Sequence, residues 1–217
     1  MLFVVSAARE IAVGFLTTLE LAVSSFAFAL VVGTLMATCR VSPVPVLRML
    51  GAAYVEIVRN VPLFVILIFL IFGLPDTGLT LPIFACLVLG IGAYTGTYVC
   101  ETIRSGILAV PRGEIEAARS LGFSITQILT LIVLPTAFRS MIQPLANIFI
   151  SAILATALGA SLGVVELTNV ATRVQDRSGQ ILTTFIIVGA GYVVLTLSVG
   201  FLASWYQTKL TGIRRKF

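Results

Sequence analysis

Residues 11–39 read IAVGFLTTLELAVSSFAFALVVGTLMATC, and Glu20 is the only formally charged residue in this stretch. A helix needs about 20 predominantly apolar residues to cross the hydrocarbon core of a bilayer. A stretch as long and as apolar as this one therefore predicts a membrane-spanning helix.

The whole chain has the same apolar character. Of its 217 residues, 59% are hydrophobic and 11% are charged, whereas about 25% of the residues of a soluble protein are charged. The net charge of +5 does not indicate a nucleic-acid partner, because the 14 basic residues stand singly between apolar runs, except for Arg214-Arg215-Lys216. Basic residues placed in this way are typical of topology signals in membrane proteins. The composition predicts an integral membrane protein in contact with the lipid bilayer.

Four further stretches are long enough or apolar enough to span a membrane, at about residues 54–74, 81–104, 141–163 and 181–205. Together with residues 11–39 they predict an all-α integral membrane protein with five transmembrane helices. We expect residues 1–217 to form a single transmembrane domain.

The distribution of arginine and lysine predicts the orientation of the chain. With the N-terminus outside and the C-terminus in the cytoplasm, five spans place three basic residues outside, which are Arg9, Arg173 and Arg177. The other 11 then lie on the inner side: Arg40, Arg48, Arg59, Arg104, Arg112, Arg119, Arg139, Lys209, Arg214, Arg215 and Lys216. This is the positive-inside bias of multi-pass membrane proteins.

The stretch at about residues 105–139 is predicted to be a cytoplasmic loop with a helix-turn-helix structure. Glycine often takes the left-handed conformation that ends a helix, and Gly122 is placed to do so. Ser124 is a plausible N-cap for a second helix that runs to Pro135. A short helix ended by a glycine forms a rigid knob that can fit a groove on a partner protein.

This loop carries a spaced motif: Glu116-Ala117-Ala118, then Gly122 after three residues, then Ile132-x-Leu134-Pro135 after nine more. It resembles the cytoplasmic EAA motif of binding-protein-dependent ABC importer permeases. The alternative is an amphipathic helix that lies on the membrane. The resemblance implies that the loop couples the chain to an ATPase subunit, through Glu116, Ala117, Ala118, Gly122, Leu134 and Pro135.

The resemblance covers nearly the whole chain. Segments 54–63, 98–107, 111–122 and 163–167 look like patterns of the polar amino acid uptake family of ABC permeases, and Arg40-Val41-Ser42-Pro43 points to its glutamate-type members. The resemblance implies a type I ABC importer permease fold, a second permease in a homodimer or heterodimer, ATPase subunits that hold ATP and Mg²⁺, and an extracytoplasmic solute-binding protein. The chain itself would hold no cofactor.

Two pairs of opposite charges recur at the same spacing. Glu56 and Arg59, like Glu101 and Arg104, are three residues apart and can meet on one face of a helix. Near the inner boundary of the membrane, pairing lowers the cost of each charge. The pairs are interpreted either as a gate or hinge contact between helices, or as intrahelical pairs that neutralise charge at a helix end.

Polar side chains in the third and fourth spans are candidates for the pathway of a zwitterionic substrate. They are Tyr94, Thr97, Tyr98, Asn147, Ser151 and Thr156. The alternative is helix packing, which hydroxyls and small residues also mediate; Gly92-x3-Gly96 and Gly159-x3-Gly163 could form close-contact faces. Family members commonly carry Lys-Asp or Lys-Asn at the place of Leu154-Ala155, so the family does not by itself give this chain's substrate.

The functional alternative is a stand-alone secondary transporter or channel. Such transporters usually have two related halves, and no internal repeat is evident here. The chain contains no histidine and no G-x-x-x-x-G-K-[ST] phosphate loop. We therefore expect a non-catalytic permease with no catalytic residue and no metal site of its own, in which a separate ATPase subunit hydrolyses ATP.

Overall fold

A computed structural model describes residues 2–212 of the chain, with side chains from residue 7 to residue 210. These residues form helices and connecting segments without a β-strand, as the sequence predicts. The predicted topology signals Arg214, Arg215 and Lys216 lie outside the described residues.

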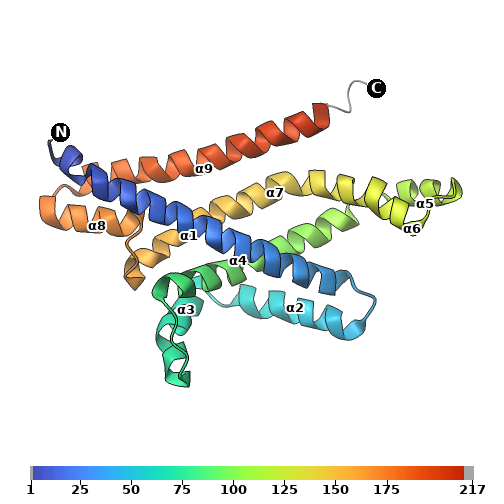
Figure 1. Ribbon diagram of the computed structural model, residues 1–217, viewed down its shortest axis with the longest axis horizontal. Helices are drawn as coiled ribbons and strands as arrows, with labels where there is room; N and C mark the ends of the chain where they lie inside the picture. The colour runs from blue at the N-terminus through green and yellow to red at the C-terminus, as the bar shows by residue number, and fades with distance from the viewer. Residues whose placement is uncertain (1, 213–217) are drawn as a thin grey trace.

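Within the described residues, four helices are long and apolar enough to cross a membrane: Ala7–Val41, Ile83–Leu108, Ile125–Leu162 and Ile181–Leu210. They correspond to α1 (Leu2–Val41), α4 (Ile83–Leu108), the continuous series α6 (Ile125–Ile128), η3 (Leu129–Val133), α7 (Leu134–Ala155) and η4 (Thr156–Leu162), and α9 (Ile181–Gly212). They run roughly along one long axis (Figure 1). At one end of the bundle lies α8 (Leu167–Ser178), and α5 (Arg112–Ser120) projects at the other; we call these the α8 end and the α5 end.

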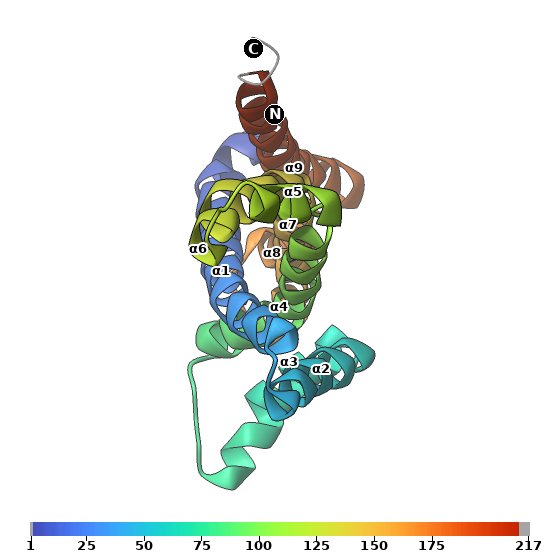
Figure 2. The same ribbon diagram turned by 90° about the vertical axis from the view of Figure 1, so that its right-hand side faces the viewer.

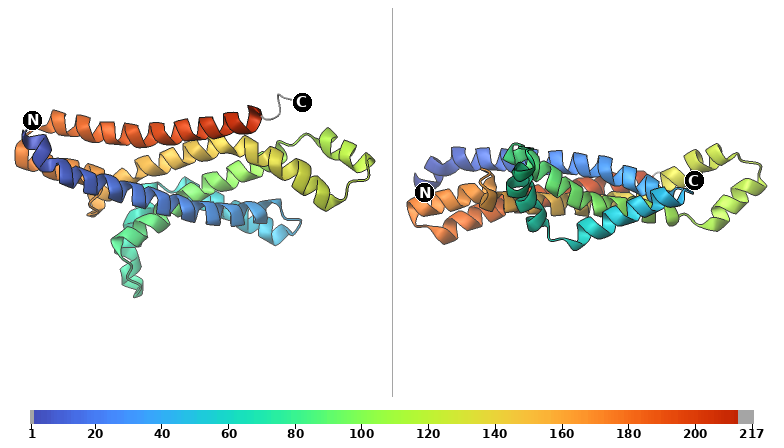
Figure 3. Two further views of the ribbon diagram at one scale, coloured as in Figure 1. Left: turned by 45° about the horizontal axis from the view of Figure 1, so that its top comes forward. Right: turned by 90° about the horizontal axis from the view of Figure 1, so that it is seen from below.

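The second predicted span, residues 54–74, is not one straight helix. Its place is taken by α2 (Pro45–Asn60) and by α3 (Leu63–Ile68), which continues through η1 (Phe69–Gly73) and η2 (Leu74–Thr77). The two arms meet at 98°, and the second arm points away from the bundle (Figures 2 and 3). The break follows from Pro62, because a residue that precedes proline avoids the helical region, and Val61 is extended (φ −95°, ψ 132°). Counted as one bent span, this pair brings the total to the predicted five.

The fourth predicted span, residues 141–163, begins earlier than expected. The helix starts at Ile125 and passes Pro135, so the prediction that a separate second loop helix ends at Pro135 is wrong. Proline removes a backbone donor from a regular helix. Here η3 is a π-helical turn in which the Leu134 amide donates to the Leu129 carbonyl, and it carries the helix into α7 with Pro135 in the first turn.

This longer helix shortens the loop. Of the predicted loop at about 105–139, only residues 109–124 lie between α4 and the next span. We call this segment the α5 loop.

The close contact of α1 with α4 rests on glycines. A Cβ atom added to Gly92 would lie 2.8 Å from the Ser25 carbonyl oxygen, and one added to Gly33 would lie 2.8 Å from the Gly96 carbonyl oxygen. Gly92 and Gly96 therefore form the predicted close-contact face. Gly163 does not, because it has nothing within 4 Å of its Cβ position and takes a left-handed φ of +88° where η4 ends.

A buried carboxylate fixes the α8 end. Glu166 has 0% of its surface exposed and caps α8 by accepting the amides of Thr168 (2.9 Å) and Asn169 (2.7 Å). The Tyr192 hydroxyl of α9 donates to the same carboxylate at 2.7 Å. The Leu167 amide donates to Thr18 of α1 at 3.0 Å. This network joins α1, α8 and α9.

Candidate functional site

The α5 loop forms a compact knob at the end of the bundle (Figure 1). The helix α5 ends in a Schellman arrangement: the Gly122 amide donates to the Arg119 carbonyl at 2.9 Å, and the Phe123 amide donates to the Ala118 carbonyl at 3.1 Å. Gly122 has a φ of +81°, which confirms the left-handed conformation predicted from the sequence.

The next helix is capped as the sequence predicts. The Ser124 hydroxyl accepts the Gln127 amide at 3.3 Å, and the Gln127 side-chain oxygen accepts the Ser124 amide at 2.8 Å. This reciprocal pair is a capping box. It fixes the turn between α5 and the long helix that begins at Ile125.

The EAA residues divide between an exposed face and a buried face. Glu116 and Ala117 are exposed, whereas Ala118 is 4% exposed and packs with Val110, Ile128 and Val133. The small size of Ala118 thus allows close packing within the loop.

Beside this exposed face lies a groove of about 390 Å³. Leu134 and Pro135 are exposed. The groove is lined by Glu114, Ala117, Ala118, Leu121, Phe123, Leu131, Ile132, Pro135, Thr136 and Arg139. Four motif residues, Ala117, Ala118, Ile132 and Pro135, thus line one groove between the α5 loop and the helix that follows it, whereas Glu116, Gly122 and Leu134 do not line it.

The α5 end also exposes large apolar side chains. Leu121 is 77% exposed, Ile125 72% and Leu131 63%. Exposed apolar patches on a projecting segment are typical of protein interaction sites.

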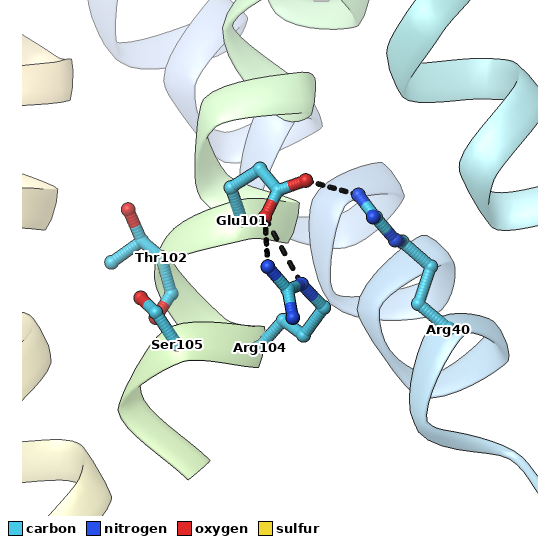
Figure 4. A network of polar contacts seen from close by, with 5 residues as sticks. All are labelled: Arg40, Glu101, Thr102, Arg104 and Ser105. Carbon is cyan, nitrogen blue, oxygen red and sulfur yellow. Dashed lines mark hydrogen bonds and ion pairs between the residues drawn. The ribbon is translucent and has the colours of Figure 1, made fainter. Parts of the chain in front are cut away.

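A network of charges lies near the α5 ends of α1 and α4 (Figure 4). Glu101 accepts from Arg104 at 3.0 Å from Nε and 2.9 Å from Nη2, which is the intrahelical pair expected from their spacing. The other carboxylate oxygen of Glu101 pairs with Arg40 of α1. Glu101 therefore joins two helices as well as two turns of its own helix.

The second predicted pair is not formed. The described residues contain no ion pair between Glu56 and Arg59. Instead the Arg59 guanidinium lies over the Tyr98 ring, 4.8 Å from its centroid. Tyr98 precedes the last residue of α4, Leu108, by ten positions, or about 15 Å of helix. Arg59 is thus deeper in the bundle than the inner boundary where the sequence placed it.

A cavity of about 310 Å³ lies between α3, α4 and α7. Its lining includes four of the six residues predicted for the substrate pathway: Tyr94, Tyr98, Asn147 and Ser151. The others are Leu63, Thr95, Ile148 and Ala155. The Tyr94 and Tyr98 hydroxyls lie 3.3 Å apart.

The remaining two pathway candidates do not line this cavity. Thr97 and Thr156 are both buried. The Thr97 hydroxyl donates to the Tyr94 carbonyl and the Thr156 hydroxyl to the Ile153 carbonyl, each at 2.7 Å. Both threonines satisfy their hydroxyls on their own helix, as the packing alternative expects.

Sequence reasoning missed two partners in these sites. In the sequence, Arg40 was interpreted as a topology signal and as part of a family pattern but not as a partner of Glu101, although both stand near the inner ends of adjacent spans. Leu63 was assigned to a lipid-spanning run, although it follows the Pro62 break that turns it toward the cavity. In both cases the sequence signal that could have identified the residue is its position next to the end of a helix.

The comparisons with known proteins agree with these features. Residues 29–212 match the family described as "Binding-protein-dependent transport system inner membrane component". The chain is 37% identical over 199 residues to a glutamate transport system permease protein of Corynebacterium glutamicum, covering 86% of this chain and 87% of that protein. It is 34% identical over 197 residues to a probable glutamine ABC transporter permease protein of Bacillus subtilis, covering 91% of each.

A solved structure is similar over almost the whole chain. The crystal structure of an amino acid ABC transporter with histidines matches with a TM-score of 0.89 and 29% sequence identity, over 96% of this chain and 97% of that chain. The five-span arrangement is therefore that of an ABC transporter permease. The chain belongs to the family of binding-protein-dependent transport system inner membrane components, and it is a membrane-spanning permease subunit of an ATP-driven importer.

Proposed function

We propose that this permease subunit imports a polar amino acid that an extracytoplasmic binding protein delivers. The observation that carries the proposal is the exposed EAA surface on a knob that projects beyond the bundle, together with a cavity between α4 and α7 whose lining includes the polar side chains of Tyr94, Tyr98 and Asn147. The names of the relatives support the substrate class, since they describe glutamate and glutamine permeases.

The α5 loop is the docking element for the ATPase subunit, which binds ATP and Mg²⁺ and hydrolyses the nucleotide. Glu116 and Ala117 present a small, acidic surface, and Leu121 and Ile125 supply exposed apolar area beside it. A surface with this combination is more stable when it is buried in a groove of a partner protein than when it is exposed to water. In this arrangement Gly122 provides the left-handed turn that ends α5, and Ala118 packs in the interior of the knob.

The orientation places the N-terminus outside and the C-terminus in the cytoplasm. This is supported by the charge count of the sequence, which assigns 11 basic residues to the side of the α5 loop and only three, Arg9, Arg173 and Arg177, to the side of α8. The α5 loop then faces the ATPase and the α8 end faces the binding protein. A second permease, identical or related, completes the pathway.

The Arg40–Glu101–Arg104 network and the Arg59–Tyr98 contact act as the gate between the cavity and the α5 end. Each joins α4 to a neighbouring helix, α1 in the first case and α2 in the second. A movement of α4 relative to these helices therefore changes both contacts at once.

The test is reconstitution in liposomes. The chain with its ATPase subunit and binding protein is expected to take up amino acid only with ATP present. An ATPase variant that cannot hydrolyse ATP is the control. Amino acid uptake by this chain alone, without an ATPase subunit, would overturn the proposal in favour of a stand-alone transporter.

A further inference from the structure

The lining of the cavity contains both polar and apolar groups but no charged side chain. The polar groups are the hydroxyls of Tyr94, Thr95, Tyr98 and Ser151 and the amide of Asn147, and the apolar ones belong to Leu63, Ile148 and Ala155. Hydroxyl and amide groups can orient a ligand by hydrogen bonds. The Thr95 and Ser151 hydroxyls already donate to the carbonyls of Ile91 (2.6 Å) and Asn147 (3.0 Å), so these two can offer a ligand only an acceptor. A volume of about 310 Å³ is at the lower end of the range for small-molecule sites.

The position of Ala155 decides the charge of this lining. Ala155 lines the cavity at the end of α7, whereas its neighbour Leu154 is 52% exposed and does not line it. The cavity therefore has a methyl group where a longer residue would place its functional group. No carboxylate among the lining residues is available to meet a cationic side chain of a ligand.

One cation lies against the cavity wall. The Arg59 guanidinium stacks on the ring of Tyr98, which lines the cavity, whereas Arg59 itself is exposed and is not among the lining residues. The described residues give Arg59 no carboxylate partner, and an ionisable residue at this depth of a membrane protein marks a functional site by default. A single cation beside an uncharged cavity can balance one carboxylate of a ligand.

We propose that this cavity receives an α-amino acid whose side chain is uncharged. The α-carboxylate lies toward Arg59 and the tyrosine hydroxyls, the α-ammonium group meets the oxygen acceptors of Asn147 and Ser151, and the side chain lies against Leu63, Ile148 and Ala155. The proposal rests on the proposed function and narrows it, because it separates glutamine-like from glutamate-like or arginine-like substrates.

The physical reason is the cost of an unpaired charge. A second carboxylate would compete with the first for Arg59, and a cationic side chain would face only neutral groups and a like charge. Removing an ionised group from water without a counter-charge is far more costly than removing a neutral amide that forms hydrogen bonds. Uncharged side chains of similar shape are therefore favoured.

The test uses two pairs of ligands that match in shape but differ in charge. The importer complex, purified through a tag on this chain and without its binding protein, is placed in lipid nanodiscs. Radiolabelled L-glutamine is displaced by L-glutamine or L-glutamate, and then by L-citrulline or L-arginine. We expect each uncharged member to displace the label at a concentration at least about tenfold lower than its charged partner.

Two variants assign the selectivity to the cavity. Ala155→Asp is expected to improve displacement by L-arginine relative to L-citrulline by about tenfold, because it supplies the missing carboxylate. Ala155→Asn has nearly the same size without the charge and is expected to leave the order unchanged. If one variant fails to assemble, the selectivity of the unaltered complex still decides the proposal.

Three outcomes would overturn it: equal displacement by L-glutamine and L-glutamate, the same ratio of arginine to citrulline displacement concentrations in the Asp and Asn variants, or no binding of any amino acid to the complex. ATP-driven uptake in liposomes separates this failure from that of the importer assignment. Uptake of a charged amino acid would agree with the importer assignment and reject only the restriction to substrates with an uncharged side chain. Absence of any ATP-driven uptake would reject the proposed function itself.

Discussion

Arg40 of α1 and Glu101 of α4 form an ion pair across 61 positions of sequence, and the same carboxylate holds Arg104 one turn further along α4. Glu101 is thus a single anion between two cations from different helices (Figure 4). Its interhelical contact can be separated from its intrahelical contact by charge reversal.

The first prediction uses that separation. Glu101→Arg combined with Arg104→Glu keeps the intrahelical pair but places like charges opposite each other at positions 40 and 101. We expect a fall in ATP-driven uptake of about tenfold and a lower Tm, because a partly buried charge loses its partner. Addition of Arg40→Glu restores opposite charges between α1 and α4 and should recover most of both. Full uptake in the double variant would contradict a role for the interhelical contact.

The second prediction concerns the left-handed turn after α5. Gly122→Ala introduces a Cβ at a φ of +81°, which costs about 1–2 kcal/mol for a residue with a side chain. We expect it to lower uptake per ATP hydrolysed, measured with the ATPase subunit in liposomes. Gly113→Ala is the matched control, because Gly113 lies in α5 with open space at its Cβ position, and alanine favours a helix. Equal coupling in the two variants would exclude a role for the turn.

The third prediction concerns the cation at the cavity wall. Arg59→Gln removes the charge that lies over Tyr98 and is expected to raise the KM for uptake about tenfold or more, with a smaller effect on Tm. Tyr98→Phe keeps the ring under the guanidinium but removes the hydroxyl that lies 3.3 Å from that of Tyr94. It should raise KM by less than about threefold, since a cation–π contact worth about 0.5–2 kcal/mol is retained. A larger effect of Tyr98→Phe would mean that the hydroxyl pair, not Arg59, carries binding.

The fourth prediction concerns the buried carboxylate at the α8 end. Glu166→Ala leaves the amides of Thr168 and Asn169 without their acceptor. It also removes one of the two partners of the Tyr192 hydroxyl, which keeps its contact with the Thr168 hydroxyl at 2.9 Å. We expect the free energy of unfolding to fall by about 2–4 kcal/mol, read as a lower Tm in detergent. Glu166→Gln keeps one carbonyl acceptor, so its free energy of unfolding should fall by less. If both variants unfold at the Tm of the unaltered chain, the network does not stabilise this corner.

The number and the approximate positions of the spans could be predicted from the sequence because a bilayer demands long apolar helices. The break at Val61 and Pro62 was missed, since averaged hydropathy does not register one extended residue inside an apolar run. The continuation of the helix through Pro135 was missed for the opposite reason. Proline was interpreted as a stop, whereas a π-helical turn from Leu129 to Val133 accommodates it.

The cavity was predictable only in part. Tyr94 with Tyr98 and Asn147 with Ser151 are each four residues apart, so each pair shares one helix face. Sequence periodicity gives these two faces but does not show that they meet, which depends on how α4 packs on α7. Thr97 lies off the first face and Thr156 off the second, and both are buried instead. The Arg40 contact depends on the glycine-mediated approach of α1 to α4, which no local pattern of charges reveals.

The continuous helical series from Ile125 to Ala155, which includes the π-helical turn of η3 and Pro144 inside α7, has a mechanical consequence. It starts one residue after the cap of the α5 loop, and Ala155 at its far end lines the cavity. Its 31 positions correspond to about 45 Å of helix, so a tilt of about 5° around the midpoint displaces each end by about 2 Å. A displacement of that size exceeds the tolerance of a hydrogen bond. A movement of the α5 loop is thus transmitted along this helix to the cavity wall at Ala155.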